Sequence, residues 1–274
     1  MSIYQLVVYT PTDVSTHARL WFPMGREQMK KQSRLKIKSF NLRCKPGATD
    51  EHPIAVIAQV RHAGSEMAEL FKASDPLEWL RDTDGLREHI HHFLKVAVQQ
   101  RASLLVFPEA SIPFSLLADV CHWSERNPQC VVIAGSHWVR TSAQKIHSCC
   151  PVFFGGNRYD SYKQVPAPDE TEAIDMRMRV EPGPHLLVLR NSPCGTIGIL
   201  VCSDYMNLTT RERYYENKHV KNLDVLCIPS CDQQPVEHFH KAISENYNRG
   251  SFSAYVLYCS LFGPQHGKGR SALF

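Results

Sequence analysis

The chain has 274 residues, of which 43% are hydrophobic and 21% are charged, and its formal net charge is +4. This balance predicts a folded globular protein with a sizeable core and argues against a disordered chain. The chain has no apolar run of about 18 residues, which argues against a membrane span. Its first residues lack the basic start and cleavage site of a secretory signal, so we expect a cytoplasmic protein with no membrane partner.

Residues 1–52 hold much of the positive charge. They contain nine of the 31 Lys and Arg residues but only four of the 27 Asp and Glu residues, and eight of these basic residues lie between positions 26 and 45. We interpret the segment as a basic N-terminal extension or the remnant of a preceding domain. A solvated helix or arm is one interpretation. A contact with nucleic acid or another acidic partner is the alternative, because clustered cations bind phosphate.

A turn-rich stretch, CKPGATDEHP, predicts a boundary after it, so that residues 53–274 form the main domain. The apolar run Ile54–Val60 predicts a strand, and apolar residues at helical spacing predict a helix from about Asp84 to Gln100. Short aliphatic runs follow, with helical patterns at roughly 204–221 and 236–250. Apolar strands that alternate with amphipathic helices predict an α/β protein whose sheets are covered by helices.

The cysteine and histidine patterns do not predict a metal site. The ten cysteines are irregularly spaced, and Cys149 and Cys150 are adjacent. This pattern fits neither a small disulfide framework nor a zinc ribbon, so we expect reduced thiols. His89, His91 and His92 lack the spacing of four residues that zinc-binding helices use, and we interpret them as a surface cluster.

Reactive or polar side chains end several predicted strands. LLVFPE ends in Glu109, TIGILVC ends in Cys202, and DVLCIPS ends in Ser230. The segment RYDSYKQVPAPDETE places Lys163 and Glu170 in a proline-rich loop after another strand. In sheets of this kind the ligand crevice lies beyond the carboxyl ends of the strands. We therefore expect an acid, an amine and a thiol to converge at one site.

The order of these motifs resembles that of the nitrilase, or carbon–nitrogen hydrolase, superfamily. The motifs are FPE ending in Glu109, Tyr162-Lys163 with Pro and Glu downstream, and VCSD around Cys202, and they occur with gaps close to those of that family. LDVLCIPS and NRGSFSAYVLYCSLFG resemble two later segments of the family. The match covers roughly residues 53–274 and is absent from residues 1–52. The resemblance implies a four-layer α-β-β-α sandwich and a Glu-Lys-Cys catalytic set.

By position, the resemblance makes Cys202 the nucleophile, Glu109 the general base and Lys163 the group that stabilises the tetrahedral intermediate. Glu170 occupies the place of a second, supporting glutamate. No cofactor is implied. The candidate residues of the substrate pocket are Asp204, Ser230 and Trp138.

The physical chemistry of these side chains fits the implied roles. Only a thiolate attacks well, and the ordinary thiol pKa is about 8.5. A helix that begins near Asp204, together with the Lys163 ammonium, would favour the thiolate of Cys202. Glu109 can accept the thiol proton and pass it to a leaving amine. The backbone N–H of Ser203 and the Lys163 ammonium would form the oxyanion hole. Taken singly, each residue also fits a structural role, such as an inert buried thiol.

Departures from the family pattern bear on the substrate. CSDYMN is nearer to the Cys-x-Asp of amidases and carbamoylases than to the Cys-Trp-Glu of true nitrilases, which favours small amide or carbamoyl substrates. MNLTTRER stands where the family commonly has Arg-Phe-Pro-Glu. The chain stops at GKGRSALF, where family members usually continue, so we expect an incomplete C-terminal part: either the chain is a fragment, or another element, domain or subunit completes the sandwich. The resemblance also implies a homo-oligomer.

Two functions from different classes remain open at this point. The first is a thiol hydrolase that cleaves a non-peptide C–N bond through a thioester on Cys202, with acyl transfer as a variant of the same chemistry. The second is a catalytically silent nitrilase-like domain that binds a ligand or mediates assembly in a larger protein.

Overall fold

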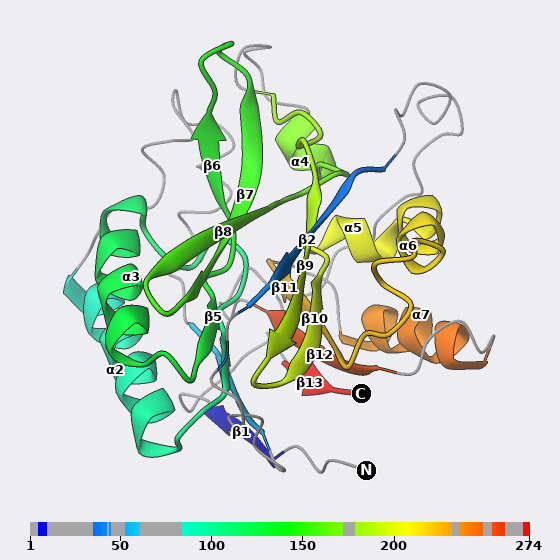
Figure 1. Ribbon diagram of the computed structural model, residues 1–274. Helices are drawn as coiled ribbons and strands as arrows, with labels where there is room; N and C mark the ends of the chain where they lie inside the picture. Colours follow the sequence, from blue (N-terminus) through cyan, green and yellow to red (C-terminus); the bar gives the residue numbers. More distant parts are fainter. Residues whose placement is uncertain are drawn as a thin grey trace.

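The computed structural model describes residues 5–9, 35–42, 44, 53–60, 84–171, 179–231, 236–248, 254–260 and 271–274. Within these ranges, two β-sheets pack face to face, and helices cover the outer face of each sheet (Figure 1). The α/β class and the four-layer α-β-β-α sandwich that the resemblance implies are therefore confirmed.

The first sheet has seven strands in the order β1-β3-β4-β5-β7-β6, with β8 pairing with β7. The pairs from β1 to β5 are parallel, whereas β7 runs antiparallel to β5, β6 and β8. The strands are β1 (Gln5–Tyr9), β3 (Ile54–Ala58), β4 (Leu104–Val106), β5 (Val131–Ile133), β6 (His137–Arg140), β7 (Ile146–Phe154) and β8 (Asn157–Tyr162).

The second sheet has six strands in the order β13-β12-β11-β10-β9-β2. The strands β10, β11 and β12 are parallel, β9 is antiparallel to β10, and β2 is parallel to β9. The strands are β2 (Ile37–Asn41), β9 (Leu186–Ser192), β10 (Gly195–Ile199), β11 (Val225–Ser230), β12 (Tyr255–Ser260) and β13 (Ala272–Leu273).

The helices form the two outer layers and the connections near the strand ends. The layer over the first sheet contains α2 (Asp84–Gln99) and α3 (Leu117–Arg126), which follows the 3₁₀ turn η3 (Phe114–Leu116). The layer over the second sheet contains α5 (Ser203–Met206), α6 (Leu208–Tyr215) and α7 (Val236–Asn248). A short helix, α4 (Pro168–Thr171), lies in the loop after β8. Among the described residues, no helix has both the length and the apolar character needed to cross a bilayer.

The alternation of side chains along each strand explains the layers. Ala55 and Ile57 of β3 face the second sheet and join the core between the sheets, whereas Val56 and Ala58 face α2 and α3. Residues of β9 to β12 divide in the same way between the central core and the helices α5 to α7. Strands that are buried on both faces, such as β3 and β11, are nearly continuous apolar runs.

The N-terminal segment takes part in both sheets. Within residues 1–52, β1 pairs with β3 at one edge of the first sheet, and β2 pairs with β9 at one edge of the second. The expected boundary after residue 52 therefore does not coincide with a break in either sheet.

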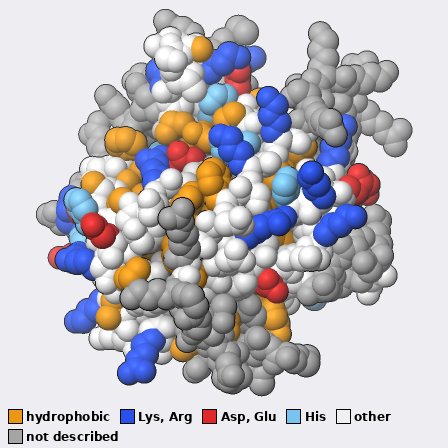
Figure 2. All heavy atoms as spheres, viewed as in Figure 1, with side chains coloured by type: hydrophobic (Ala, Val, Ile, Leu, Met, Phe, Trp, Pro, Cys, Tyr) orange, Lys and Arg blue, Asp and Glu red, His pale blue; other side chains and the backbone are white. Residues whose placement is uncertain are grey.

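The described part of the basic stretch is an edge strand and not a helix or arm, with Lys36 and Lys38 exposed on alternate positions. Basic side chains are spread over this face of the described residues, and acidic ones are sparse (Figure 2). The rest of residues 26–45 lies outside the described ranges.

The other expected elements agree with the structure apart from one helix. The expected helix over 84–100 is α2, and the pattern at 236–250 is α7. The pattern at roughly 204–221 forms two short helices, because Asn207 is extended and its side chain accepts the backbone N–H of Thr210 to start α6. The nucleophile candidate therefore precedes a helix of only four residues, α5.

Candidate active site

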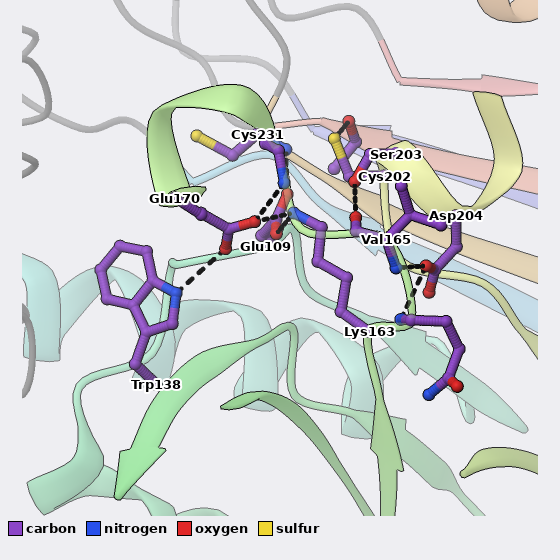
Figure 3. A network of polar contacts seen from close by, with 12 residues as sticks. Glu109, Trp138, Lys163, Val165, Glu170, Cys202, Ser203, Asp204 and Cys231 are labelled. Atoms are coloured by element: carbon purple, nitrogen blue, oxygen red, sulfur yellow. Dashed lines mark hydrogen bonds and ion pairs between the residues drawn. The ribbon is translucent and has the colours of Figure 1, made fainter. Parts of the chain in front are cut away.

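Lys163 lies at the centre of a buried polar network, directly after β8. Its Nζ donates to Oε1 of Glu109 at 2.9 Å and to Oε2 of Glu170 at 2.8 Å. The side chain of Lys163 is 2% exposed. Figure 3 shows the lysine reaching from its loop toward the two glutamates, with Cys202 near the same ammonium. An ammonium with two carboxylate partners is well satisfied in a buried setting.

Glu170 is held by three different donors. Besides the lysine, its Oε2 accepts the backbone N–H of Ala167 at 2.6 Å, and its Oε1 accepts the indole N–H of Trp138 at 3.0 Å. Trp138 is itself buried on β6. These contacts fix the orientation of the Glu170 carboxylate, and so place it where it can hold Lys163 (Figure 3).

Glu109 follows β4 and connects the two sheets. Its Oε1 faces Lys163, and its Oε2 accepts the backbone N–H of Cys231, the residue after β11, at 3.1 Å. The loop that carries Glu109 approaches Gly135 closely: a Cβ at Gly135 would lie 2.0 Å from the carbonyl oxygen of Pro108, and the φ of Gly135 is +68°. Only glycine fits a position that combines this backbone conformation with such a close approach.

Cys202 lies in the turn between β10 and α5. It caps α5 with φ 45° and ψ −106°, a conformation that non-glycine residues rarely adopt and that recurs at functional sites. Its backbone N–H donates to the carbonyl of Pro229 at 2.9 Å, and its Sγ accepts the hydroxyl of Ser230 at 3.3 Å. Both contacts tie the turn to the end of the neighbouring strand β11. Cys202 is half-buried, whereas Cys149, Cys150, Cys227 and Cys259 are buried.

The two residues after Cys202 contact the loop after Lys163. Asp204 Oδ1 accepts the backbone N–H groups of Gln164 at 2.8 Å and Val165 at 2.7 Å, and the Ser203 hydroxyl donates to the carbonyl of Val165. Asp204 has no exposed surface. Asp204 therefore connects the two loops and does not form an exposed wall of a pocket (Figure 3).

The charges of the network determine the protonation of Lys163. Burial alone would lower the pKa of Lys163, but the charges of Glu109, Glu170 and Cys202 outweigh burial and raise the pKa well above its usual value. The lysine therefore stays cationic at neutral pH. In this state it can stabilise a nearby anion but cannot act as a general base.

Several buried thiols elsewhere in the protein have raised pKa values. Burial raises the pKa of Cys149 to about 12, and it raises the pKa values of Cys150, Cys227 and Cys259 well above the ordinary value. These thiols are protonated at neutral pH and poor nucleophiles. Cys202 differs from them in lying half-buried beside a cationic lysine and a hydroxyl donor.

The structure brings most of the candidate residues together. Hydrogen bonds join Glu109, Lys163, Glu170 and Trp138, and another joins Cys202 to Ser230. The role of the Ser203 N–H in an oxyanion hole stays a prediction. Sequence reasoning missed the backbone donors of Ala167 and Cys231, since a backbone N–H carries no residue-type signal. Among the described residues, no group of three or more His, Cys, Asp and Glu side chains is placed to hold a metal ion.

Comparison with known proteins links this geometry to solved structures. No model of a known protein family matches the chain, and no curated protein matches it in sequence. Among solved structures, Saccharomyces cerevisiae Nit3, a member of branch 10 of the nitrilase superfamily, is 15% identical with a TM-score of 0.53, over 80% of each chain. An amidase from Nesterenkonia sp. is 12% identical with a TM-score of 0.54, over 89% of this chain and 83% of that one.

A third similar structure is longer than this chain. The glutamine-dependent NAD+ synthetase from Acinetobacter baumannii is 13% identical with a TM-score of 0.52, over 80% of this chain but only 44% of its own. The aligned part of this chain thus corresponds to less than half of that synthetase. All three comparisons agree on the architecture that the sequence motifs imply. The chain therefore has the fold of the nitrilase superfamily.

Proposed function

We propose that the protein is a thiol hydrolase that cleaves the C–N bond of a small amide or carbamoyl compound through a thioester on Cys202. The observation that supports this proposal is the buried Glu109–Lys163–Glu170 network, whose lysine is cationic and has a pKa that responds to the charge of the half-buried Cys202. A structural core gains little from burying three ionisable groups, whereas a catalytic site uses them.

The network suggests how the first half of the reaction proceeds. Glu109 accepts the proton of the Cys202 thiol, and the sulfur attacks the substrate carbonyl carbon to form a C–S bond. The carbonyl oxygen becomes an oxyanion, which the Lys163 ammonium and the backbone N–H of Ser203 stabilise. The C–N bond then breaks, and Glu109 returns the proton to the leaving nitrogen. Ammonia or an amine departs and a thioester remains.

The second half releases the acyl group by the same residues. Glu109 takes a proton from a water molecule, and the resulting hydroxide attacks the thioester carbonyl. The C–S bond breaks, the carboxylic acid leaves, and the proton returns to the thiol. Another nucleophile in place of water would give acyl transfer. In this scheme, Glu170 orients Lys163 and touches no reacting atom.

The amide preference rests on the CSD motif and on one solved relative. A structure of a Nesterenkonia amidase variant shows covalent addition of the acetamide moiety of fluoroacetamide at its active-site cysteine. In this chain, Asp204 follows Cys202 by two residues, as in the Cys-x-Asp pattern of the amidase branch. A homo-oligomer, a further domain or subunit, and a nucleic-acid contact of the basic segment are also proposals.

The test measures ammonia release from a panel of small aliphatic amides and carbamoyl compounds. We expect at least one substrate to be hydrolysed, with an acyl adduct on the Cys202 peptide after acid quenching. Cys202→Ala abolishes turnover and adduct, and Lys163→Met lowers kcat by roughly a hundred- to thousand-fold, as expected for the loss of an oxyanion donor. Cys121→Ala, a half-buried thiol of α3, is the matched control and leaves turnover unchanged.

The opposite result would favour the second function. If no compound gives an adduct, and Cys202 reacts with iodoacetamide no faster than the other thiols of the native protein, the chain is a catalytically silent domain. The fold and the buried network would stand in that case, but the network would be structural.

A further inference from the structure

The residues that follow the candidate nucleophile bind the residues that follow the candidate lysine. Asp204 Oδ1 accepts two backbone N–H groups, from Gln164 at 2.8 Å and from Val165 at 2.7 Å. Ser203 completes the contact, because its hydroxyl donates to the carbonyl of Val165. Three hydrogen bonds thus connect two loops from different sheets, which are nearly forty residues apart in the chain.

These bonds lie next to the reactive groups. Asp204 and Ser203 lie within two residues of Cys202, and Gln164 and Val165 lie within two residues of Lys163. The turn of Cys202 has a rarely adopted backbone conformation, which persists only when surrounding contacts enforce it. Beyond the three bonds, the Asp204 backbone N–H donates to the carbonyl of Val201, so the aspartate is fixed on its own side of the contact as well.

The burial of the Asp204 carboxyl group is energetically unfavourable, which indicates that its hydrogen bonds serve a function. Asp204 is fully buried, and among the described residues its second oxygen, Oδ2, has no hydrogen-bond partner. Burying a carboxyl group with one unsatisfied oxygen is unfavourable. An aspartate is nevertheless well suited here, because one carboxyl oxygen can accept two adjacent backbone N–H groups, which no apolar side chain can do.

We propose that Ser203 and Asp204 form a positioning clamp, which holds the Lys163 loop against the turn of Cys202 and thereby sets the separation between the Lys163 ammonium and the Cys202 sulfur. The side chains of the clamp touch no reacting atom and act through the lysine, separately from the oxyanion contact proposed above for the backbone N–H of Ser203. Its function rests on the roles proposed above for Cys202 and Lys163, although its hydrogen bonds do not.

The clamp predicts the ionisation of Cys202. The ammonium favours the thiolate only at short range, since the attraction between two charges falls with distance. If the loops separate, the thiol pKa rises, and the thiolate fraction at neutral pH falls about tenfold for each unit of pKa. Because the thiol pKa is defined without turnover, it tests the clamp even if the protein hydrolyses no amide.

The experiment measures alkylation of Cys202 by iodoacetamide against pH, peptide by peptide, in the full chain. The variants are Ser203→Ala, Asp204→Ala and Asp204→Asn, and hydrogen exchange reports the backbone amides of Gln164 and Val165. We expect Asp204→Ala to raise the apparent pKa of the Cys202 thiol, with roughly tenfold slower alkylation at pH 7 and faster amide exchange. Ser203→Ala shifts the profile in the same direction by less. Asp204→Asn keeps an acceptor oxygen and restores most of the reactivity.

Two controls separate positioning from general loosening. Asn207→Ala removes a side-chain bond to the backbone of Thr210 in the same segment without touching the Lys163 loop, and it leaves the Cys202 profile unchanged. In a Lys163→Met background, Ser203→Ala has no further effect on the thiol pKa, because the clamp acts through the lysine. If Asp204→Ala does not fold, the effect of Ser203→Ala on the apparent pKa of the Cys202 thiol tests the clamp by itself.

Two results overturn the clamp. The first is a wild-type alkylation profile of Cys202 in folded variants whose backbone amides at 164 and 165 exchange faster. The hydrogen bonds of the clamp would then be lost in the variants without any change in the pKa of the thiol. The other is an equal shift with Ser203→Ala in the presence and in the absence of the lysine. A failure of the proposed hydrolase looks different: no amide is hydrolysed, while the variants still shift the thiol pKa.

Discussion

Lys163 and Glu170 form an ion pair that is almost completely removed from solvent: Nζ lies 2.8 Å from Oε2, and the side chains are 2% and 3% exposed. The glutamate is seven residues after the lysine, and the loop between them folds back so that the backbone N–H of Ala167 also reaches the same oxygen. A charge in such a place depends on its partner, because water cannot replace it.

Removal of Glu170 therefore strongly destabilises the protein. Glu170→Ala leaves the lysine with one carboxylate and deprives two donors of their acceptor, so we expect the free energy of unfolding to fall by about 3–5 kcal/mol. Urea denaturation measures the change. Glu181→Ala is the matched control, because its ion pair with Lys145 is exposed and contributes about 0–1 kcal/mol. Equal losses in the two variants would contradict a structural role for the buried pair.

A methyl group at Gly135 is expected to displace the loop of Glu109. The new Cβ would lie 2.0 Å from the carbonyl oxygen of Pro108, and the φ of +68° adds a cost of about 1–2 kcal/mol for any residue with a Cβ. We expect Gly135→Ala to lower stability by more than this backbone cost and to reduce Cys202 alkylation.

The control for this prediction is Gly85→Ala in α2. A Cβ at Gly85 would meet nothing within 4 Å, and alanine is the better helix former by about 1 kcal/mol, so this variant is neutral or stabilising. A Gly135→Ala protein as stable as the wild type would show that the loop of Glu109 can move without cost.

Ser230 is predicted to support the thiolate of Cys202. Its hydroxyl donates to the sulfur at 3.3 Å, and a hydrogen bond to a charged group contributes about 1.5 kcal/mol or more, which is roughly tenfold in an equilibrium. Ser230→Ala should therefore raise the apparent pKa of the thiol and slow its alkylation at pH 7 by about that factor. Ser124→Ala removes a hydroxyl from α3 that donates to the carbonyl of Cys121, and it should leave Cys202 unaffected.

Much of the fold could be predicted from the sequence because both faces of each sheet are buried. The runs that form β3, β10, β11 and β12 are mostly apolar, and such runs stand out without an alignment. The edge strand β2 could not be recognised, because its exposed Lys38 lies between half-buried residues and resembles part of a basic arm. Edge strands commonly carry such charges, which prevent pairing with other chains.

The candidate site also has a part that could be predicted from the sequence and a part that could not. Glu109, Lys163, Glu170 and Cys202 could be chosen because each is a reactive side chain near a strand end, in the order of a known family. The groups that hold them could not be chosen, since the N–H of Cys231 and that of Ala167 belong to the backbone. The contacts of Asp204 could not be predicted either: its position beside the candidate nucleophile suggested a pocket residue, whereas its carboxyl group accepts two backbone N–H groups of the loop after Lys163.

The burial of Asp204 predicts how stability changes with pH. Burial raises its pKa from 3.8 to about 7, although the bonds from Val165 and Gln164 and the charge of Lys163 act in the opposite direction. Between about pH 4 and pH 7 the unfolded chain loses this proton while the folded protein keeps it, so this group lowers the stability as the pH rises through that window. Above pH 7 both states are ionised and the effect is constant.

Asp204→Asn removes the titration but keeps an acceptor for the clamp. We expect the variant to gain stability relative to the wild type from pH 4 to pH 7, by up to a few kcal/mol because each unit of pKa corresponds to about 1.4 kcal/mol, and the difference to level off above pH 7. Urea denaturation at several pH values measures it. Asp204→Ala serves as the control: it shows the same pH trend on a lower baseline, because it loses the clamp as well as the ionisable group. A stability difference between Asp204→Asn and the wild type that does not vary between pH 4 and pH 8 would show that the Asp204 carboxyl group is as easily ionised in the folded protein as in the unfolded chain.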